Sequence, residues 1–183
     1  MTEILCLCGS LRQPSYNRAA LEAAGMLAPE GVLLRMATLS ALPLFNPDEE
    51  DHHEVAALAQ AIAEADGVLI ASPEYAHGIS SVLKNALDWL VSDQAFPEMP
   101  VALINTSPRA HHAMDALREV LRTMSANIIA PACIELPLLG SELDASGVAA
   151  HPAHSKVLRK MLGTFANEIH QSPRLTTVQK RET

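Results

Sequence analysis

The sequence predicts an α/β protein: a parallel sheet with helices on both faces. Short, continuously apolar segments alternate with longer segments rich in Ala and Leu along most of the 183 residues. Short apolar segments of this kind are typical of strands that are buried on both faces. Strict alternation of strands and helices indicates a parallel sheet, because each crossover returns the chain through a helix. The length is that of one domain.

Five short apolar segments are expected to form the strands. They are residues 3–8, 32–38, 67–72, 100–106 and 127–136, and Pro131 interrupts the last one. Cys6 and Cys8 alternate along the first strand and therefore face the same side. We interpret them as small apolar core residues, with a disulfide or a metal pair as the weaker alternative.

Five longer segments are expected to form the helices, at residues 16–28, 53–65, 81–91, 110–125 and 152–169. Ser15 is a favourable N-cap for the first helix, and Gly67 suits the end of the second. The fourth helix carries an apolar stripe at helical spacing: Met114, Leu117, Leu121 and Met124.

The third helix has a similar stripe: Leu83, Leu87, Leu90 and Val91. Trp89 falls off that stripe, and we expect it to face a partner subunit. The domain is expected to span residues 1–170, followed by a flexible polar tail at 171–183.

Right-handed crossovers between parallel strands leave few topologies. Five strands and five helices suit a flavodoxin-like three-layer sandwich, with a five-stranded parallel sheet in the order 2-1-3-4-5. Ligands of such sheets bind beyond the carboxyl ends of the strands, at the switch point between the first and third strands. The loops at residues 9–15 and 73–81 are therefore the candidate binding loops.

Composition and charge exclude several function classes. The formal net charge is −8 and no basic stripe is present, so nucleic acid is not an expected partner. No apolar stretch approaches the roughly 20 residues of a membrane span, and no signal peptide is expected. His151 and His154 share a helix face, but no third ligand stands at a recognisable spacing, so no metal site is expected. A cytoplasmic enzyme or binding protein is the expected class.

The first loop, "GSLRQPSYNR", has the composition of an anion cradle. Ser10, Arg12, Ser15 and Asn17 can together surround one phosphate, at the positive end of the helix that follows. The loop lacks both the Gly-Lys-Ser/Thr ending and the G-x-G-x-x-G pattern, so one phosphate monoester fits better than a pyrophosphate. An ordinary strand-to-helix turn with a capping serine is the alternative interpretation.

The second loop is predicted to support a planar ring. Pro73 turns the chain out of the third strand, and the residues that follow lie at the switch point: Glu74, Tyr75, Ala76, His77 and Gly78. Their backbone N–H groups can donate to the edge of a heterocycle, and Tyr75 offers a flat contact surface. Glu74 is expected to fix the loop rather than to donate a proton. Tyr16 lies beside the phosphate loop, so a phosphate site and a ring platform together indicate a flavin mononucleotide (FMN).

The stretches "GSLRQPSYNR" and "SPEYAHGISSVLKNALDW" resemble the two signature stretches of the NAD(P)H-dependent FMN reductase family, which includes quinone, azo-dye and chromate reductases. The resemblance implies an enzyme that passes hydride from NADPH or NADH through FMN to a small oxidant: a quinone, a flavin, an azo compound or a metal oxyanion. It implies that flavin N5, and no catalytic side chain, carries the chemistry. Members are commonly homodimers or homotetramers.

The chain departs from the family pattern at three places. Ala76 replaces the usual Asn, Ser80–Ser81 replace Pro-Gly, and the loop at 105–113 has no glycine. Thr106, Ser107 and Arg109 in that loop are expected to make polar contacts with the ring or its ribityl chain. Two other functions stay open: a flavodoxin-type electron carrier, and a divergent flavin-free binding protein.

Overall fold

The computed structural model describes residues 1–49 and 52–171. The tail predicted at 171–183 lies outside the described residues, except for Gln171, which ends the last helix. No helix in the described ranges has both the length and the apolar character needed to cross a membrane.

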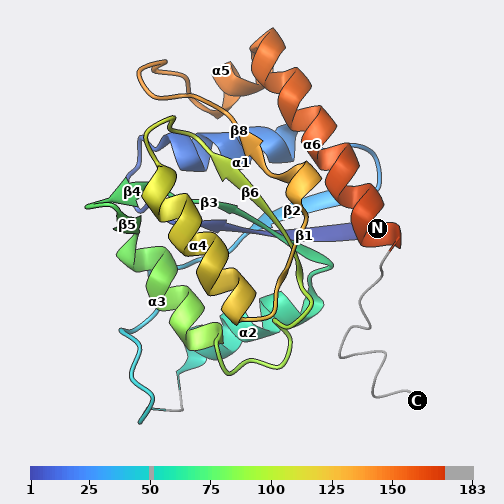
Figure 1. The fold of residues 1–183 in the computed structure, drawn as a ribbon. Helices are drawn as coiled ribbons and strands as arrows, with labels where there is room; N and C mark the ends of the chain where they lie inside the picture. Colours follow the sequence, from blue (N-terminus) through green and yellow to red (C-terminus); the bar gives the residue numbers. More distant parts are fainter. Residues whose placement is uncertain (50–51, 172–183) are drawn as a thin grey trace.

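A parallel sheet forms the centre of the molecule (Figure 1). Its strands are β1 (Thr2–Cys8), β2 (Val32–Met36), β3 (Gly67–Ala71), β6 (Pro100–Asn105) and the short β7 (Asn127–Ile128). They lie in the order β2-β1-β3-β6-β7, which confirms the predicted order 2-1-3-4-5. The switch point therefore lies between β1 and β3, as expected from the sequence.

The last strand is divided near Pro131, which confirms the interruption predicted within residues 127–136. It consists of β7 and β8 (Ile134–Glu135), separated by a single 3₁₀ turn at Ala130–Ala132, and both pieces pair with β6. Pro131 lies in that turn. Because proline has no N–H to donate to the ladder, it interrupts the pairing rather than merely bending it.

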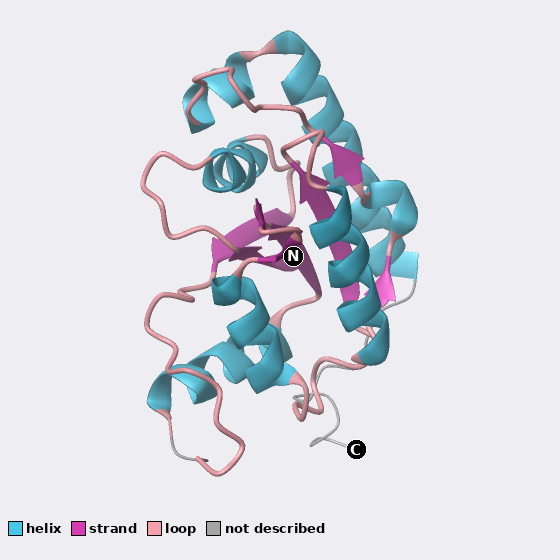
Figure 2. Ribbon diagram, turned by 60° about the vertical axis from the view of Figure 1, so that its left-hand side comes forward, coloured by secondary structure: helices cyan, strands magenta, loops and turns pink. Residues whose placement is uncertain are grey.

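Helices cover both faces of the sheet, which confirms the three-layer sandwich (Figures 1 and 2). On one face pack α1 (Tyr16–Met26), α5 (Ala145–Ala150) and α6 (Pro152–Gln171). On the other face pack α2 (His53–Glu64), α3 (Ser81–Leu90) and α4 (His111–Thr123). For the five helices that the sequence predicted, the observed boundaries differ from the predicted ones by at most about two residues at each end.

Side chains of β1 alternate between the two cores. Ile4, Cys6 and Cys8 point into the core under α1 and α6, and Leu5 and Leu7 point into the other. Both cysteines are free and buried, which confirms their prediction as core residues. Burial raises the pKa of the Cys6 thiol to about 12, so this thiol stays protonated and unreactive at neutral pH.

Two elements were missed by sequence reasoning. One is a hairpin of β4 (Glu74–Tyr75) and β5 (Gly78–Ile79), whose two-residue turn has φ of 48° at Ala76 and 61° at His77. The other is α5, a short helix of small residues that Asp144 caps by accepting a hydrogen bond from the Gly147 N–H at 2.7 Å. The hairpin lies within the predicted binding loop at residues 73–81, and α5 packs against α1, which follows the other predicted loop.

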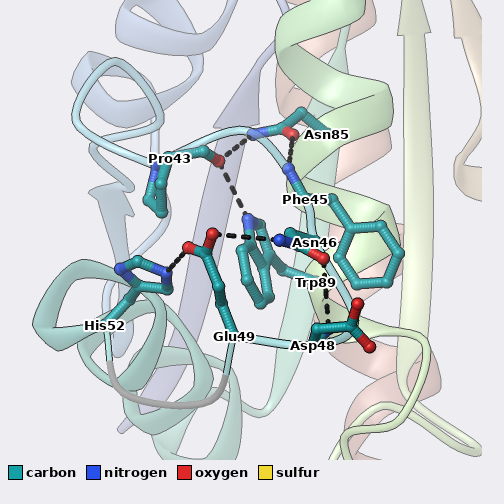
Figure 3. Close-up of polar contacts among 8 residues, drawn as sticks. All are labelled: Pro43, Phe45, Asn46, Asp48, Glu49, His52, Asn85 and Trp89. Carbon is teal, nitrogen blue, oxygen red and sulfur yellow. Dashed lines mark hydrogen bonds and ion pairs between the residues drawn. The ribbon is translucent and has the colours of Figure 1, made fainter.

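Trp89 packs against the chain's own loop between β2 and α2 (Figure 3). Its indole Nε1 donates to the carbonyl of Pro43 at 2.9 Å, and its ring meets Phe45 and His52 edge to face, with centroids 5.0 and 5.4 Å apart. Asn85 donates to the same carbonyl at 2.8 Å and accepts from the Phe45 N–H at 2.8 Å. These contacts give Trp89 a role within its own chain.

The predicted stripe of α3 is right in its first three members and wrong in its last. Leu83, Leu87 and Leu90 are fully buried, whereas Val91 is 61% exposed. Val91 follows the last residue of the helix, so it has left the buried face.

Candidate functional site

A cavity of about 650 Å³ opens at the carboxyl ends of β1, β3 and β6. Four segments line it: residues 10–22, 73–75, 106–110 and 139–145. The structure brings eleven of the predicted site residues together around this space: Ser10, Arg12, Ser15, Tyr16, Asn17, Pro73, Glu74, Tyr75, Thr106, Ser107 and Arg109. Ala76, His77 and Gly78 are not part of the lining, because they form the turn and the far strand of the β4–β5 hairpin.

Gly9 allows the first two loops to approach each other closely. A Cβ at this position would lie 2.2 Å from the Ser72 hydroxyl oxygen and 2.8 Å from that of Ser80. These two hydroxyl groups are themselves hydrogen-bonded at 3.2 Å. The glycine is therefore required by packing between the loops, in addition to the turn that the sequence suggested.

The end of the cavity beside α1 is rich in hydrogen-bond donors. Ser15 caps the helix, its hydroxyl accepting from the Arg18 N–H at 3.4 Å. The amides of the helix's first residues have no partner within α1, and no acidic side chain occupies the first turn. The N-terminal end of α1 is thus available to an anion.

Two side chains add to this donor set. Ser10 is only 3% exposed, yet within the described part of the chain its hydroxyl has no hydrogen-bond partner. Arg12 is exposed, and its guanidinium forms no ion pair with any described acidic residue. A cavity-lining hydroxyl and a guanidinium, neither of them paired with a described residue, are groups that a bound phosphate would satisfy.

The hairpin is fixed to α4 through Glu74. Its Oε2 accepts from the Ala113 N–H at 2.9 Å, and its Oε1 lies 3.1 Å from His77 Nδ1. The Ala113 N–H is the main cause of a lowered pKa of the Glu74 carboxyl, and the hydrogen bond with His77 adds to it. The carboxylate is thereby held ionised, which confirms its predicted role in tying down the loop.

Ser80, at one of the positions where the family pattern has Pro-Gly, has a local function. Its hydroxyl accepts from the Leu83 N–H at 3.3 Å and so caps α3. The serine cap therefore defines the start of α3, at the position where the family's second signature stretch has Pro-Gly.

The loop at residues 105–113 does not need the glycine that it lacks. None of its residues has a positive φ. Side chains close its turns instead: the Asn105 Oδ1 accepts from the Ser107 N–H at 3.1 Å, and the Ser107 hydroxyl accepts from the Arg109 N–H at 3.3 Å. Thr106 donates to Asn17 Oδ1 at 3.0 Å and so connects this loop to α1.

The segment at 139–145 is a wall of the cavity that sequence reasoning missed. Leu139, Glu142, Leu143, Asp144 and Ala145 line the space. The hydroxyl of Tyr16 accepts from the Gly140 N–H at 3.3 Å and the Glu142 N–H at 3.4 Å, and so fixes this wall to α1. Its place after the last strand was the available signal, since all carboxyl ends of a parallel sheet share one edge.

The family model of NADPH-dependent FMN reductase matches residues 2–136. Among curated relatives, an NAD(P)H-dependent FMN reductase of Pseudomonas aeruginosa is 38% identical over 110 residues, which are 57% of this chain and 60% of that protein. A 2-hydroxy-1,4-benzoquinone reductase of Burkholderia is 40% identical over 110 residues, with the same coverage of both chains. The chain thus spans about 60% of the length of these curated relatives.

Solved structures share the fold over nearly the whole chain. The flavoenzyme NAD(P)H:(acceptor) oxidoreductase FerB from Paracoccus denitrificans has a TM-score of 0.79 at 24% identity, and the alignment covers 93% of this chain and 98% of that one. The family resemblance predicted from the two signature stretches is confirmed by the family model, which covers both stretches. The chain belongs to the NADPH-dependent FMN reductase family.

Proposed function

We propose that the protein is an FMN-dependent NAD(P)H oxidoreductase. It would pass hydride from NADH or NADPH through bound FMN to a small oxidant, such as a quinone, a flavin, an azo compound or a metal oxyanion. The observation that carries the proposal is that a donor-rich helix end and the hairpin face the same cavity of about 650 Å³. This volume lies within the usual range for small-molecule and cofactor sites.

The phosphate of FMN would be held by the residues beside α1. Ser10, Ser15 and Asn17 would donate hydrogen bonds, and Arg12 would add a charge with several donors. The formal net charge of −8 does not oppose this, because arginine and a helix N-terminus act at short range. The unpaired Ser10 hydroxyl and Arg12 guanidinium support the assignment.

The ring would lie against the hairpin and the 105–113 loop. Pro73, Glu74 and Tyr75 line this part of the cavity, and Thr106 and Ser107 line the opposite side. Ala76, His77 and Gly78 lie outside the lining and would contribute through the backbone, by shaping the hairpin that carries Glu74 and Tyr75. The Glu74 bond to Ala113 keeps the two sides at a fixed separation.

When bound, FMN supplies the hydride-accepting and electron-transferring chemistry, so the protein needs no side-chain nucleophile. The side chains of this chain bind and orient the cofactor and its substrates. Backbone N–H groups of the hairpin would favour negative charge that develops on the ring, as donors of an oxyanion hole do.

The test is a titration of the purified protein with FMN, followed by addition of NADH or NADPH with and without benzoquinone. We expect tight FMN binding and NAD(P)H oxidation that depends on the quinone. Arg12→Ala should weaken FMN binding by about 10- to 100-fold, the usual value of a hydrogen bond to a charged group. Gln13→Ala, a change of the neighbouring uncharged lining residue, is the matched control.

Three results would contradict the proposal. FMN binding without any NAD(P)H oxidation would favour an electron carrier. Failure to bind FMN would favour a flavin-free binding protein. An Arg12→Ala protein that retains FMN as tightly as the wild type would remove the phosphate assignment.

We also infer a homodimer or homotetramer located in the cytoplasm, with no nucleic-acid or membrane partner. The family resemblance supports the oligomer, and the acidic net charge supports the absence of nucleic acid. Light scattering after size-exclusion chromatography should give a mass of two or four chains; a monomer at micromolar concentration would contradict the oligomer.

A further inference from the structure

We propose that Thr106 is a positioning residue that fixes the side-chain amide of Asn17 with its NH₂ group toward the phosphate. This inference rests on the proposed FMN-dependent function and assigns a role within that same site. It gives Thr106 a task different from the direct ring or ribityl contact expected from the sequence.

The two residues form a buried link between distant parts of the chain. Thr106 Oγ1 donates to Asn17 Oδ1 at 3.0 Å, across a sequence separation of 89 residues. Thr106 is 4% exposed and Asn17 is 6% exposed, and both line the cavity. A hydrogen bond excluded from water in this way has strong control over side-chain orientation.

The direction of this bond determines what Asn17 can offer a ligand. A carboxamide has one acceptor end and one donor end. Thr106 occupies the acceptor Oδ1, and no described residue accepts a hydrogen bond from Nδ2. The group that Asn17 presents to the cavity is therefore a donor, which an anion attracts.

Without Thr106, the amide could rotate by half a turn. It would then place Oδ1 toward the phosphate, and two oxygen acceptors would face each other. In the observed orientation the Thr106 hydroxyl donates to Oδ1 and leaves Nδ2 free for the phosphate, so Thr106 acts on the phosphate through Asn17 and not by touching it.

The backbone holds Thr106 in place for this task. Its carbonyl accepts from the Leu138 N–H at 3.0 Å. The adjacent Asn105 side chain closes the turn by accepting from the Ser107 N–H at 3.1 Å. The position of Oγ1 is therefore set by the end of β6 and by the segment that follows β8.

The experiment compares FMN with riboflavin, which has the same ring and ribityl chain but no phosphate. Dissociation constants for both ligands are measured by flavin fluorescence for the wild type, Thr106→Val, Asn17→Ala and the double variant. Thr106→Val removes the hydroxyl and keeps the shape. Thr106→Ser keeps the hydroxyl and is the matched control.

We expect Thr106→Val and Asn17→Ala each to weaken FMN binding by about tenfold, the usual value of a hydrogen bond to a charged group. The double variant should bind FMN at most about twofold more weakly than either single variant, because both changes remove the same interaction. Thr106→Ser should bind FMN within about twofold of the wild type. Riboflavin binding should stay unchanged in all variants.

Other outcomes overturn the inference. An equal loss of FMN and riboflavin binding in Thr106→Val would mean direct contact with the ring or ribityl chain, or damage to the fold. Unchanged FMN binding in Thr106→Val, with a loss in Asn17→Ala, would mean that Asn17 acts without Thr106. A wild-type protein that binds neither ligand would instead overturn the proposed function itself.

Discussion

In the loop before α1 and the first turn of that helix the backbone is relaxed and two polar side chains are buried, whereas in the β4–β5 hairpin the turn is strained and Tyr75 is exposed. Ser10 and Asn17 are nearly inaccessible, and no residue of the 9–18 segment has a positive φ. Ala76 and His77 both have positive φ, and Tyr75 is 52% exposed. The difference indicates that the loop before α1 has a relaxed, fixed geometry, whereas the hairpin turn stores backbone strain.

The largest effect is expected where the two loops meet, at Gly9. Gly9→Ala would place a Cβ 2.7 Å from the Ser72 Cβ, which no rotation of a flexible side chain can relieve. We expect a loss of about 1–3 kcal/mol in the free energy of unfolding, as for other overpacked sites. Urea unfolding of the variant and the wild type measures this loss of stability. Gly163→Ala in α6, where a Cβ meets nothing within 4 Å, should be neutral or stabilising. Equal stability of Gly9→Ala and the wild type would mean that the loops are not in close contact.

A smaller effect is expected at Tyr16. Tyr16→Phe removes the acceptor of the Gly140 and Glu142 N–H groups, and should cost about 0.5–1 kcal/mol because both amides regain contact with water. Hydrogen exchange of these two amides should accelerate. Tyr75→Phe is the control, since no described residue bonds to the Tyr75 hydroxyl. Unchanged exchange in Tyr16→Phe would show that the 139–145 wall does not depend on α1.

The strain at the hairpin predicts a stabilising substitution. Ala76→Asn should raise the free energy of unfolding by about 0.5–1 kcal/mol, because asparagine tolerates the left-handed region better than alanine does. Thermal unfolding of the two proteins measures the difference. A destabilised Ala76→Asn protein would mean that the turn is not strained in solution.

The smallest effect is a pH dependence at Glu74. The Ala113 N–H lowers the pKa of this carboxyl below its ordinary value of 4.5. Its contribution to stability is therefore fully present above about pH 4.5 and is lost as the pH falls through the lowered pKa. Glu74→Gln should lack this part of the pH dependence. Parallel stability curves of the two proteins between pH 3 and pH 6 would contradict the assigned hydrogen bond.

The sheet order and the two cores were predictable because they follow from local patterns. The continuous apolar character of the strands can be read from the sequence, and so can the alternation of β1 side chains between the two faces of the sheet. The hairpin was not predictable, because its turn residues, Ala76 and His77, are not those that usually mark such a turn. Helix α5 could not be predicted either, because it is too short to show the periodicity of a helix.

Eleven of the predicted site residues line one cavity, because the switch-point rule identifies the loops that carry them. The rule could not find the link between Thr106 and Asn17, which depends on the approach of two segments 89 residues apart. It also could not distinguish the residues of the hairpin that face the cavity from those that face away.

The packing of Trp89 has a practical consequence. Because the chain has one tryptophan, its ultraviolet emission comes from a single known place, the contact of α3 with Pro43, Phe45 and His52. Emission would therefore report when this loop separates from α3, while circular dichroism reports the loss of the helices as a whole. If the two signals change at different urea concentrations, the molecule comes apart in stages, and the native sequence already carries the probe that would reveal it.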